Sequence, residues 1–251
     1  MKNTFVIALL AAGISTSAQA DTLLGLYLGA DGWRTDTSGS FGNNEPLQAF
    51  NFEPSTQSSF YLALEHPIPV LPNVRLQYND LKSSGSTDIQ QQFNFAGQNF
   101  NVNSRIFNEL DLSSTDVVLY YELLDNALLS LDFGLNAKLV EGRAFVREQV
   151  PQGRSGEEEV SQWLPMLYAS TQVGLPLTGL DLFASGSFIG WSDSRMYDVQ
   201  AGVAYKVVDS LAVNVRLKLG YRAVNLKLDD LDNLYTNVDF KGVFAGIELH
   251  F

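Results

Sequence analysis

The last ten residues of the chain, 242–251, alternate between a purely apolar set of side chains and a mixed set that includes Glu248 and His250. A two-residue period is that of a β-strand whose two faces meet different surroundings. In a bilayer every backbone polar group must be hydrogen-bonded internally, so only helices and closed barrels can span it. The segment therefore fits a lipid-facing strand of a closed transmembrane barrel. Its apolar set is Val243, Ala245, Ile247, Leu249 and Phe251.

The N-terminus has the three parts of an export signal. Lys2 precedes an apolar run at 5–14, and a small-x-small site follows at 18–20. A bilayer span needs about 20 residues, so this run is too short for a membrane anchor. Lipidation at the cleavage point is excluded because the chain has no cysteine. We expect residues 1–20 to be a cleaved signal peptide and residues 21–251 to form one exported domain.

Composition narrows both the fold and the partners. The formal net charge is −12, and an acidic chain is a poor ligand for nucleic acid. Without cysteines no disulfide can staple an exported domain, so its stability must come from a large cooperative sheet. Beyond the N-terminal segment no apolar stretch approaches the length of a membrane-spanning helix. The exported part therefore either is soluble or crosses a membrane as strands.

Period-two alternation recurs along the whole chain and predicts ten strands. Sequence periodicity alone does not separate a barrel from a soluble β-sandwich, which would bury its apolar face between two sheets. The strand count becomes eight or twelve if the weak seventh and eighth segments or a loop hairpin are misread. The predicted strands are 22–34, 58–66, 73–82, 116–123, 129–139, 161–175, 180–191, 195–206, 210–222 and 242–251.

The lengths of the connections favour the barrel. Outer-membrane barrels have short periplasmic turns and longer extracellular loops. The even-numbered connections are all tight, and the odd ones are long with the exception of 192–194. We therefore expect an all-β fold, a transmembrane antiparallel up-and-down β-barrel of ten strands, in the outer membrane of a Gram-negative bacterium. The long connections are 35–57, 83–109, 141–160 and 223–235.

Three segments resemble a family of small proteobacterial outer-membrane β-barrel proteins. They are Glu65–Asn73 (EHPIPVLPN), Asp116–Asn126 (DVVLYYELLDN) and Gly246–Phe251 (GIELHF). The similarity covers the exported part of the chain. It implies the fold and the compartment, and it implies no catalytic residue because that family has no assigned activity.

The two histidines argue against a hydrolase. Enzymes built on such barrels place a catalytic histidine near the outer rim, whereas His66 and His250 fall at the periplasmic ends of their strands. A general base must lie within hydrogen-bond reach of the proton that it removes. We therefore expect a non-enzymatic protein without cofactor or metal. A carboxylate-based hydrolase at the outer rim stays as a third hypothesis, since aspartates are plentiful.

The inward-facing set carries acids and bases in near balance. Buried charges persist when they are paired and hydrogen-bonded, which predicts a network that fills the lumen. A ten-stranded barrel is only slightly wider than one that side chains can fill. The alternative function is a narrow channel in which the same charges select small solutes. The predicted lumen charges are Asp31, Glu65, Arg75, Asp116, Glu122, Asp132, Lys138, Asp181, Asp198, Lys206, Arg216, Lys218, Arg222 and Glu248.

The outer loops and the last strand suggest the partners. Residues 93–102 predict a hairpin that either presents an aromatic surface or packs on neighbouring loops. The acidic run 157–159 is typical of a solvated tip. We expect contacts with outer-membrane lipids and lipopolysaccharide, and a structural or surface-interaction role. Barrel-assembly machinery and periplasmic chaperones are the expected partners of a C-terminal signal formed by Ile247, Leu249 and Phe251.

Overall fold

A computed structural model describes residues 24–251 except 45, 127, 211 and 232–233. The expected signal peptide, 1–20, lies outside the described residues. In the part of the chain that is described, all regular structure is β, and no helix is long and apolar enough to span a bilayer.

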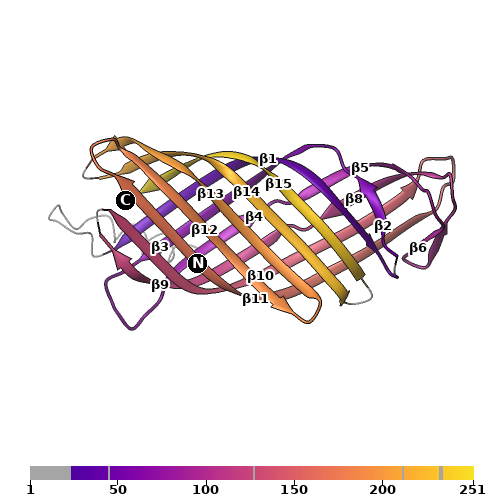
Figure 1. Ribbon diagram of the computed structural model, residues 1–251, viewed down its shortest axis with the longest axis horizontal. Helices are drawn as coiled ribbons and strands as arrows, with labels where there is room; N and C mark the ends of the chain where they lie inside the picture. The colour runs from indigo at the N-terminus through magenta and orange to yellow at the C-terminus, as the bar shows by residue number, and fades with distance from the viewer. Residues whose placement is uncertain (1–23, 45, 127, 211, 232–233) are drawn as a thin grey trace, which may run out of the picture.

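Ten strands form a closed antiparallel barrel, which confirms the predicted fold (Figure 1). Each strand pairs with the next along the wall, and the pairing of the last strand with the first closes it. The wall consists of β1 (Gly25–Gly42), β3 (Ser55–Glu65), β4 (Asn73–Asn79), β9 (Ser114–Asp125), β10 (Leu129–Glu148), β11 (Ser155–Leu175), β12 (Leu180–Trp191), β13 (Ser194–Asp209), β14 (Asn214–Leu231) and β15 (Leu234–His250).

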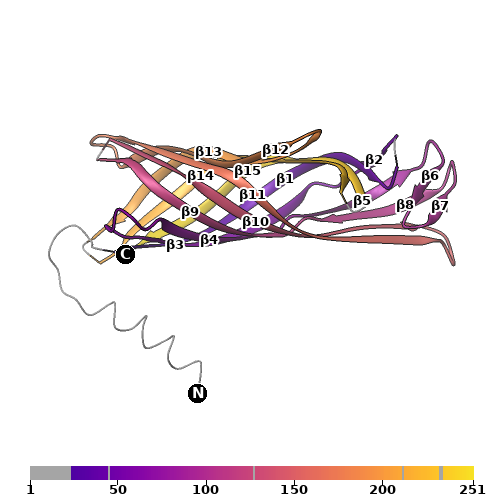
Figure 2. The same cartoon turned by 90° about the horizontal axis from the view of Figure 1, so that it is seen from below.

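Five short strands lie toward the end of the barrel that carries the long connections. β5 follows β4 and β8 precedes β9, and β8 pairs with both β5 and β10. β2 pairs with β1, and β6 with β7 forms the hairpin predicted within 93–102. Figure 2 shows this hairpin at the opposite end from the C terminus. The bounds are β2 (Gln48–Asn51), β5 (Lys82–Asp88), β6 (Phe93–Phe95), β7 (Gln98–Phe100) and β8 (Arg105–Asp111).

The strands are longer than the sequence predicts, because much of the expected outer loops is sheet. β10 continues to Glu148 and β11 begins at Ser155, while β14 and β15 extend through most of 223–235. The same parity of residues keeps facing inward, but their chemistry reverses. On β14 the inward residues change from Lys218 and Arg222 to the buried Val224 and Leu226. The alternation of polar inward and apolar outward residues therefore stops before the strand itself ends.

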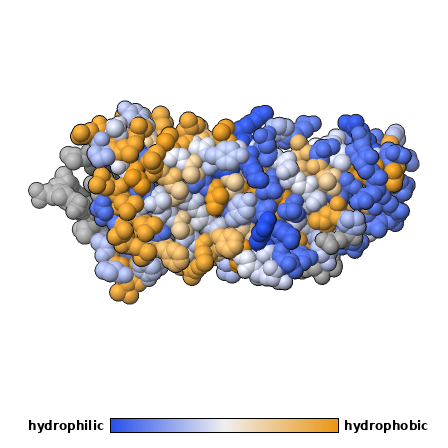
Figure 3. All heavy atoms as spheres, viewed as in Figure 1, coloured by the Kyte–Doolittle hydropathy of each residue, from blue (hydrophilic) through white to orange (hydrophobic). Residues whose placement is uncertain are grey.

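This reversal divides the barrel into two parts: the band, nearer the tight turns, and the extension, nearer the long connections. In the band, outward side chains are apolar and inward ones are polar, as a lipid-exposed barrel requires. In the extension beyond it, inward side chains form an apolar core that includes Phe41, Ile106, Val146 and Phe240. Figure 3 shows apolar residues gathered over one half of the visible surface and hydrophilic residues over the other.

The wall has a notch where one outer connection is short. β12 ends at Trp191 and β13 begins at Ser194, while β10 and β11 run on past this turn toward β6 (Figure 1). β11 pairs with β12 only up to Leu167↔Phe188. Residues 155–166 thus form an unpaired edge on that side, and Pro165 lies just beyond the last pair. Proline has no N–H to give to a ladder and is confined in sheets to such edges or to bulges.

Candidate functional site

The outer ion cluster, formed by Asp116, Lys138, Asp198 and Arg222, crosses the lumen at the boundary with the extension. The Lys138 ammonium lies 2.8 Å from Asp116 and 3.4 Å from Asp198, and Arg222 lies 2.7 Å from Asp198. Only 1% of Lys138 is exposed. Four charges from β9, β10, β13 and β14 are thereby neutralised in pairs within the barrel.

Two asparagines complete the hydrogen bonding of this cluster. Asn79 Nδ2 donates to Asp116 at 2.7 Å, and its Oδ1 accepts from Arg222 at 2.8 Å. Asn136 Nδ2 donates to the other oxygen of Asp116. Such bridges offset the cost of removing charges from water. The sequence prediction missed both asparagines because it considered only charged residues, although their inward parity was readable.

The inner ion cluster, formed by Asp31, Asp181, Arg216, Lys218 and Glu248, lies closer to the C terminus. Lys218 Nζ is 2.8 Å from Asp31, and Arg216 is 3.0 Å from Glu248 and 3.7 Å from Asp181. A tyrosine and an arginine fill the space between the two clusters. They are Tyr61, which donates to Glu248, and Arg75, whose guanidinium lies 3.7 Å from the Tyr61 ring centroid.

The remaining predicted lumen charges stand apart from the clusters. Glu65 accepts from the Tyr120 hydroxyl at 2.8 Å. Asp132 accepts from Ser130, and Glu122 is exposed. Lys206 is bonded to Asp209 of its own strand. The structure therefore gathers nine of the predicted charges into two ion-paired clusters and leaves these four, with Arg75, outside them.

The lumen contains a small polar cavity. Arg75, Gln77, Asn136, Tyr168 and Asp198 are among the residues around a polar cavity of about 30 Å³. This volume holds roughly one or two water molecules.

The histidines lie at the turn end of the barrel, which is the end that carries the tight turns. The His250 ring stacks on Tyr27 with 4.1 Å between centroids, and His66 Nε2 is 3.2 Å from the carbonyl oxygen of Pro72. Neither residue approaches the extension. No group of three His, Asp or Glu side chains among the described residues is placed to hold a metal ion.

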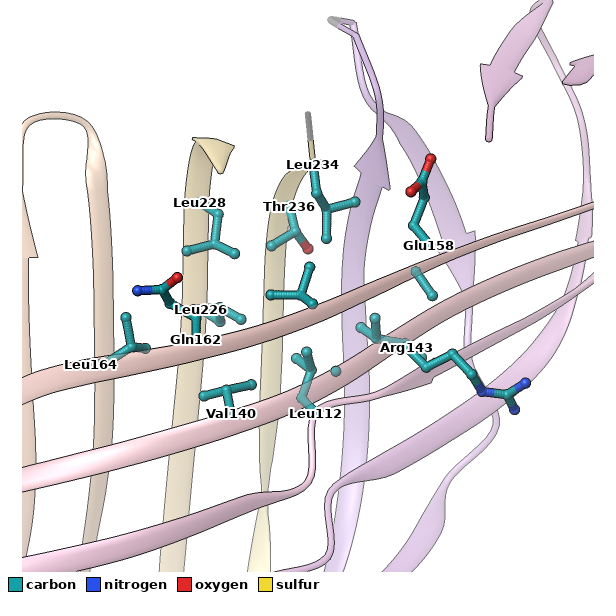
Figure 4. A pocket seen from close by; sticks show the side chains of 14 residues that line it. Leu112, Val140, Arg143, Glu158, Gln162, Leu164, Leu226, Leu228, Leu234 and Thr236 are labelled. Atoms are coloured by element: carbon teal, nitrogen blue, oxygen red, sulfur yellow. The ribbon is translucent and has the colours of Figure 1, made fainter. Parts of the chain in front are cut away.

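The extension contains a second, apolar site, which we call the mouth cavity (Figure 4). Its walls come from β10 and β11 on one side and from β14 and β15 on the other. Its volume is about 20 Å³, roughly the space of one water molecule. Glu158 and Gln162 of β11 stand at its rim, while the Arg143 guanidinium points away from it. Its apolar lining includes Leu112, Val140, Val160, Leu164, Leu226, Leu228 and Leu234.

The aromatic hairpin packs inward rather than presenting a surface. Phe93, Phe95 and Phe100 are buried, and Phe95 and Phe93 pack edge-on against Phe41 and Phe50 respectively. This is the packing alternative of the sequence interpretation. It makes the hairpin a lid on the core of the extension.

The acidic run 157–159 is not a solvated tip, as the sequence suggested, but part of strand β11. Glu157 and Glu159 face outward, and Glu157 pairs with Arg143 at 3.5 Å. Glu158 faces inward and is half-buried, with a bond from Asn43 at 3.3 Å. The alternation of a strand explains why adjacent glutamates differ.

The three residues of the expected C-terminal signal lie at the turn end of the barrel. Ile247 and Phe251 are exposed on the outward side, and Leu249 is half-exposed. The backbone of Phe251 exchanges hydrogen bonds with Leu26 of the adjoining strand region. Recognition of this segment by assembly machinery stays a prediction.

The sequence matches no protein-family model and no curated protein. Among solved structures the chain is similar to outer membrane protease OmpT from Escherichia coli, with a TM-score of 0.49 and 11% identity over 95% of this chain and 99% of that chain. It is similar to the translocator domain of autotransporter NalP from Neisseria meningitidis, with a TM-score of 0.46 and 11% identity over 100% and 94%. For Ail of Yersinia pestis the TM-score is 0.38, with 11% identity over 90% and 99%. These similarities extend to the fold alone.

The strand order and the closing pair of β15 with β1 make the protein a ten-stranded antiparallel β-barrel by fold. Membership of one particular family of small proteobacterial barrels stays a prediction.

Proposed function

We propose that the chain is a non-enzymatic barrel of the Gram-negative outer membrane, with a closed lumen and a rigid extension that makes contacts at the cell surface. The turn end then faces the periplasm and the extension faces outward. The observation that carries the closed lumen is the outer ion cluster. Lys138 and Asp116 are almost completely buried there. The 3.4 Å contact of Lys138 on β10 with Asp198 on β13, and the 2.8 Å bond from Arg222 on β14 to Asn79 on β4, join strands that are not neighbours in the wall.

Planar-bilayer recording tests the closed lumen. The purified protein is expected to give no steady conductance, because permeating ions would have to displace two ion clusters. Replacing Lys138, Asp198 and Arg222 of the outer cluster and Arg216, Lys218 and Glu248 of the inner cluster by serine removes both barriers and should produce a measurable current. Large, reproducible conductance from the unchanged protein would contradict the proposal.

The alternative is a narrow channel, and the polar cavity of about 30 Å³ between the clusters favours it. In that case charges on facing walls select the solute. The facing charges are Arg75, Lys138, Arg216, Lys218 and Arg222 against Asp116, Asp132 and Asp198. Charge reversal at these positions should then change ion selectivity, and unchanged selectivity would argue against a channel.

A cationic belt at the outer edge of the band supports lipid contact. Arg34, Arg195 and Lys241 are exposed, although Lys241 already pairs with Asp239 at 3.1 Å. Arg195 stands directly opposite Lys227 on the neighbouring strand. Like charges directly opposite each other on neighbouring strands are destabilising, and a bound anion would relieve their repulsion. We propose that lipopolysaccharide phosphates occupy this belt. Glutamine at all four positions should reduce the lipopolysaccharide that copurifies, relative to glutamine at Arg105 and Arg154, which lie farther out on the extension.

A further inference from the structure

The notch places the apolar interior of the extension beside the outer boundary of the lipid-facing surface. Trp163 and Phe188 are 53% and 52% exposed on the two sides of it. Polar residues lie further out on both sides: Ser161 on β11, and Arg195, which is the β13 partner of Gly190. A molecule at the notch would therefore meet both hydrocarbon and water.

The mouth cavity lies directly behind the free edge of β11. Leu164 and Gln162 of that edge line it, and Leu226 and Leu228 of β14 form the opposite wall (Figure 4). Its interior is leucine-rich, whereas its rim carries a carboxylate, Glu158. The site thus combines an apolar depth with an anionic rim.

We propose that the notch and the mouth cavity bind an amphiphile that has a hydrocarbon chain and a protonated amine head. The chain enters between β11 and β14, and the head remains at the rim beside Glu158. Arg143 does not neutralise this carboxylate, because it points away from the cavity and pairs with Glu109 and Glu157. A carboxylate or sulfate head would be repelled.

The free edge also explains how a cavity of about 20 Å³ can accept a chain. Residues 155–166 keep their ladder with β10 but have none with β12, so this segment can move away from β14 together with β10 without breaking a β11–β12 ladder. The apolar contacts that are lost between the walls are replaced by contacts with the chain. A fully paired wall would have to give up a ladder to open in this way.

Methyl NMR of leucine-labelled protein in lipid nanodiscs tests this proposal. Decylamine, decanol and decanoate are added at equal mole fraction in the lipid. Decylamine should shift the methyl signals of Leu226 and Leu228 saturably, with an apparent affinity about tenfold above that of decanol and with no saturable shift from decanoate. The lipid-facing Leu217 and Leu219 of the same strand report nonspecific partitioning.

A matched pair of variants isolates the head contact. Glu158→Gln should abolish the preference for the amine, while Glu159→Gln, one residue further along and facing outward, should preserve it. Ala144→Phe should block the cavity and remove all saturable shifts. Heat-modifiability on a gel shows whether the Ala144→Phe barrel folds. If it does not fold, the comparison of Glu158→Gln with Glu159→Gln alone tests the proposal.

The proposal would be overturned if decylamine shifted the methyl signals of Leu226 and Leu228 no more than those of Leu217 and Leu219. It would also be overturned if Glu158→Gln and Glu159→Gln showed the same preference for the amine. Neither result bears on the closed lumen, which conductance measures separately. The inference thus goes beyond the proposed function and can fail independently of it.

Discussion

The band and the extension of this barrel share the same strands but obey opposite rules. In the band, Lys218 and Arg222 point inward and Leu217 and Leu219 point outward. In the extension of the same strand, Val224 and Leu226 point inward. Every second residue of a strand faces inward throughout the barrel. Whether these inward residues are polar or apolar depends on the solvent around that part of the wall.

The physical reason is that the two parts exclude different solvents. In hydrocarbon an apolar outer face costs nothing, so the interior can carry ion pairs if every charge is satisfied. In water the apolar side chains must be inside to gain from burial. The change between Arg222 and Val224 therefore marks the outer limit of the band on β14.

The largest effect is expected from a charge placed in the core of the extension. Phe240, which is fully buried, changed to Asp should cost more than about 4 kcal/mol, because an isolated carboxylate is buried without a partner. Urea unfolding in vesicles, followed by tryptophan fluorescence, measures it. Asp239→Asn on the outward face is the control, and equal losses for both variants would refute the assigned orientation.

Loss of the central cation in the lumen should rank second. Lys138→Met leaves Asp116 and Asp198 short of a partner and should cost about 3–5 kcal/mol in the same unfolding assay. Pairing it with Asp116→Leu should recover part of this loss, since the charge deprived of its partner is then removed. No recovery in the double variant would show that the two residues are not coupled.

An outward charge distinguishes the band from the extension. Leu167→Arg on β11 faces lipid and should cost about 2–4 kcal/mol if it lies near the bilayer centre, and less toward the interface. Ser161→Arg faces water on the same strand and should change stability by no more than about 0.5 kcal/mol. Similar values at the two positions would erase the boundary drawn between the two parts.

The smallest effect should come from an ion pair on the outside of the extension. Arg143 contacts Glu109 and Glu157 with about a third of its side chain exposed. Arg143→Ala should therefore cost at most about 1 kcal/mol, and the cost should shrink in high salt because water and ions screen the pair. A loss as large as that of Lys138→Met would contradict this.

The fold could be predicted from the sequence because lipid-facing alternation is a direct physical requirement on every strand. Ten strands, their order and the short turns follow from it. The length of the strands did not, because beyond Arg222 the same parity carries the opposite polarity. In β10, β11, β14 and β15 the alternation of inward and outward residues continues past the predicted ends, while the polarity of the two faces is exchanged.

The candidate sites were predictable only in part. The inward parity of Lys138 and Asp198 was readable, but which charges meet across the lumen depends on strand tilt and register. The short connection at 192–194 was visible as an exception among the outer loops. Its consequence, a notch beside an apolar cavity, needs the unequal heights of neighbouring strands, which no local pattern contains.

The pairing of β1 with β15 runs from Tyr27↔His250 to Gly42↔Tyr235. This pairing joins the parts of the sheet that are most distant in sequence, so the contact order is high. The chain loses the entropy of bringing its ends together before the hydrogen bonds of this ladder can stabilise the barrel. Closure is therefore expected to be a late and slow folding event. Until it occurs, the chain carries two unpaired edges that are open to aggregation.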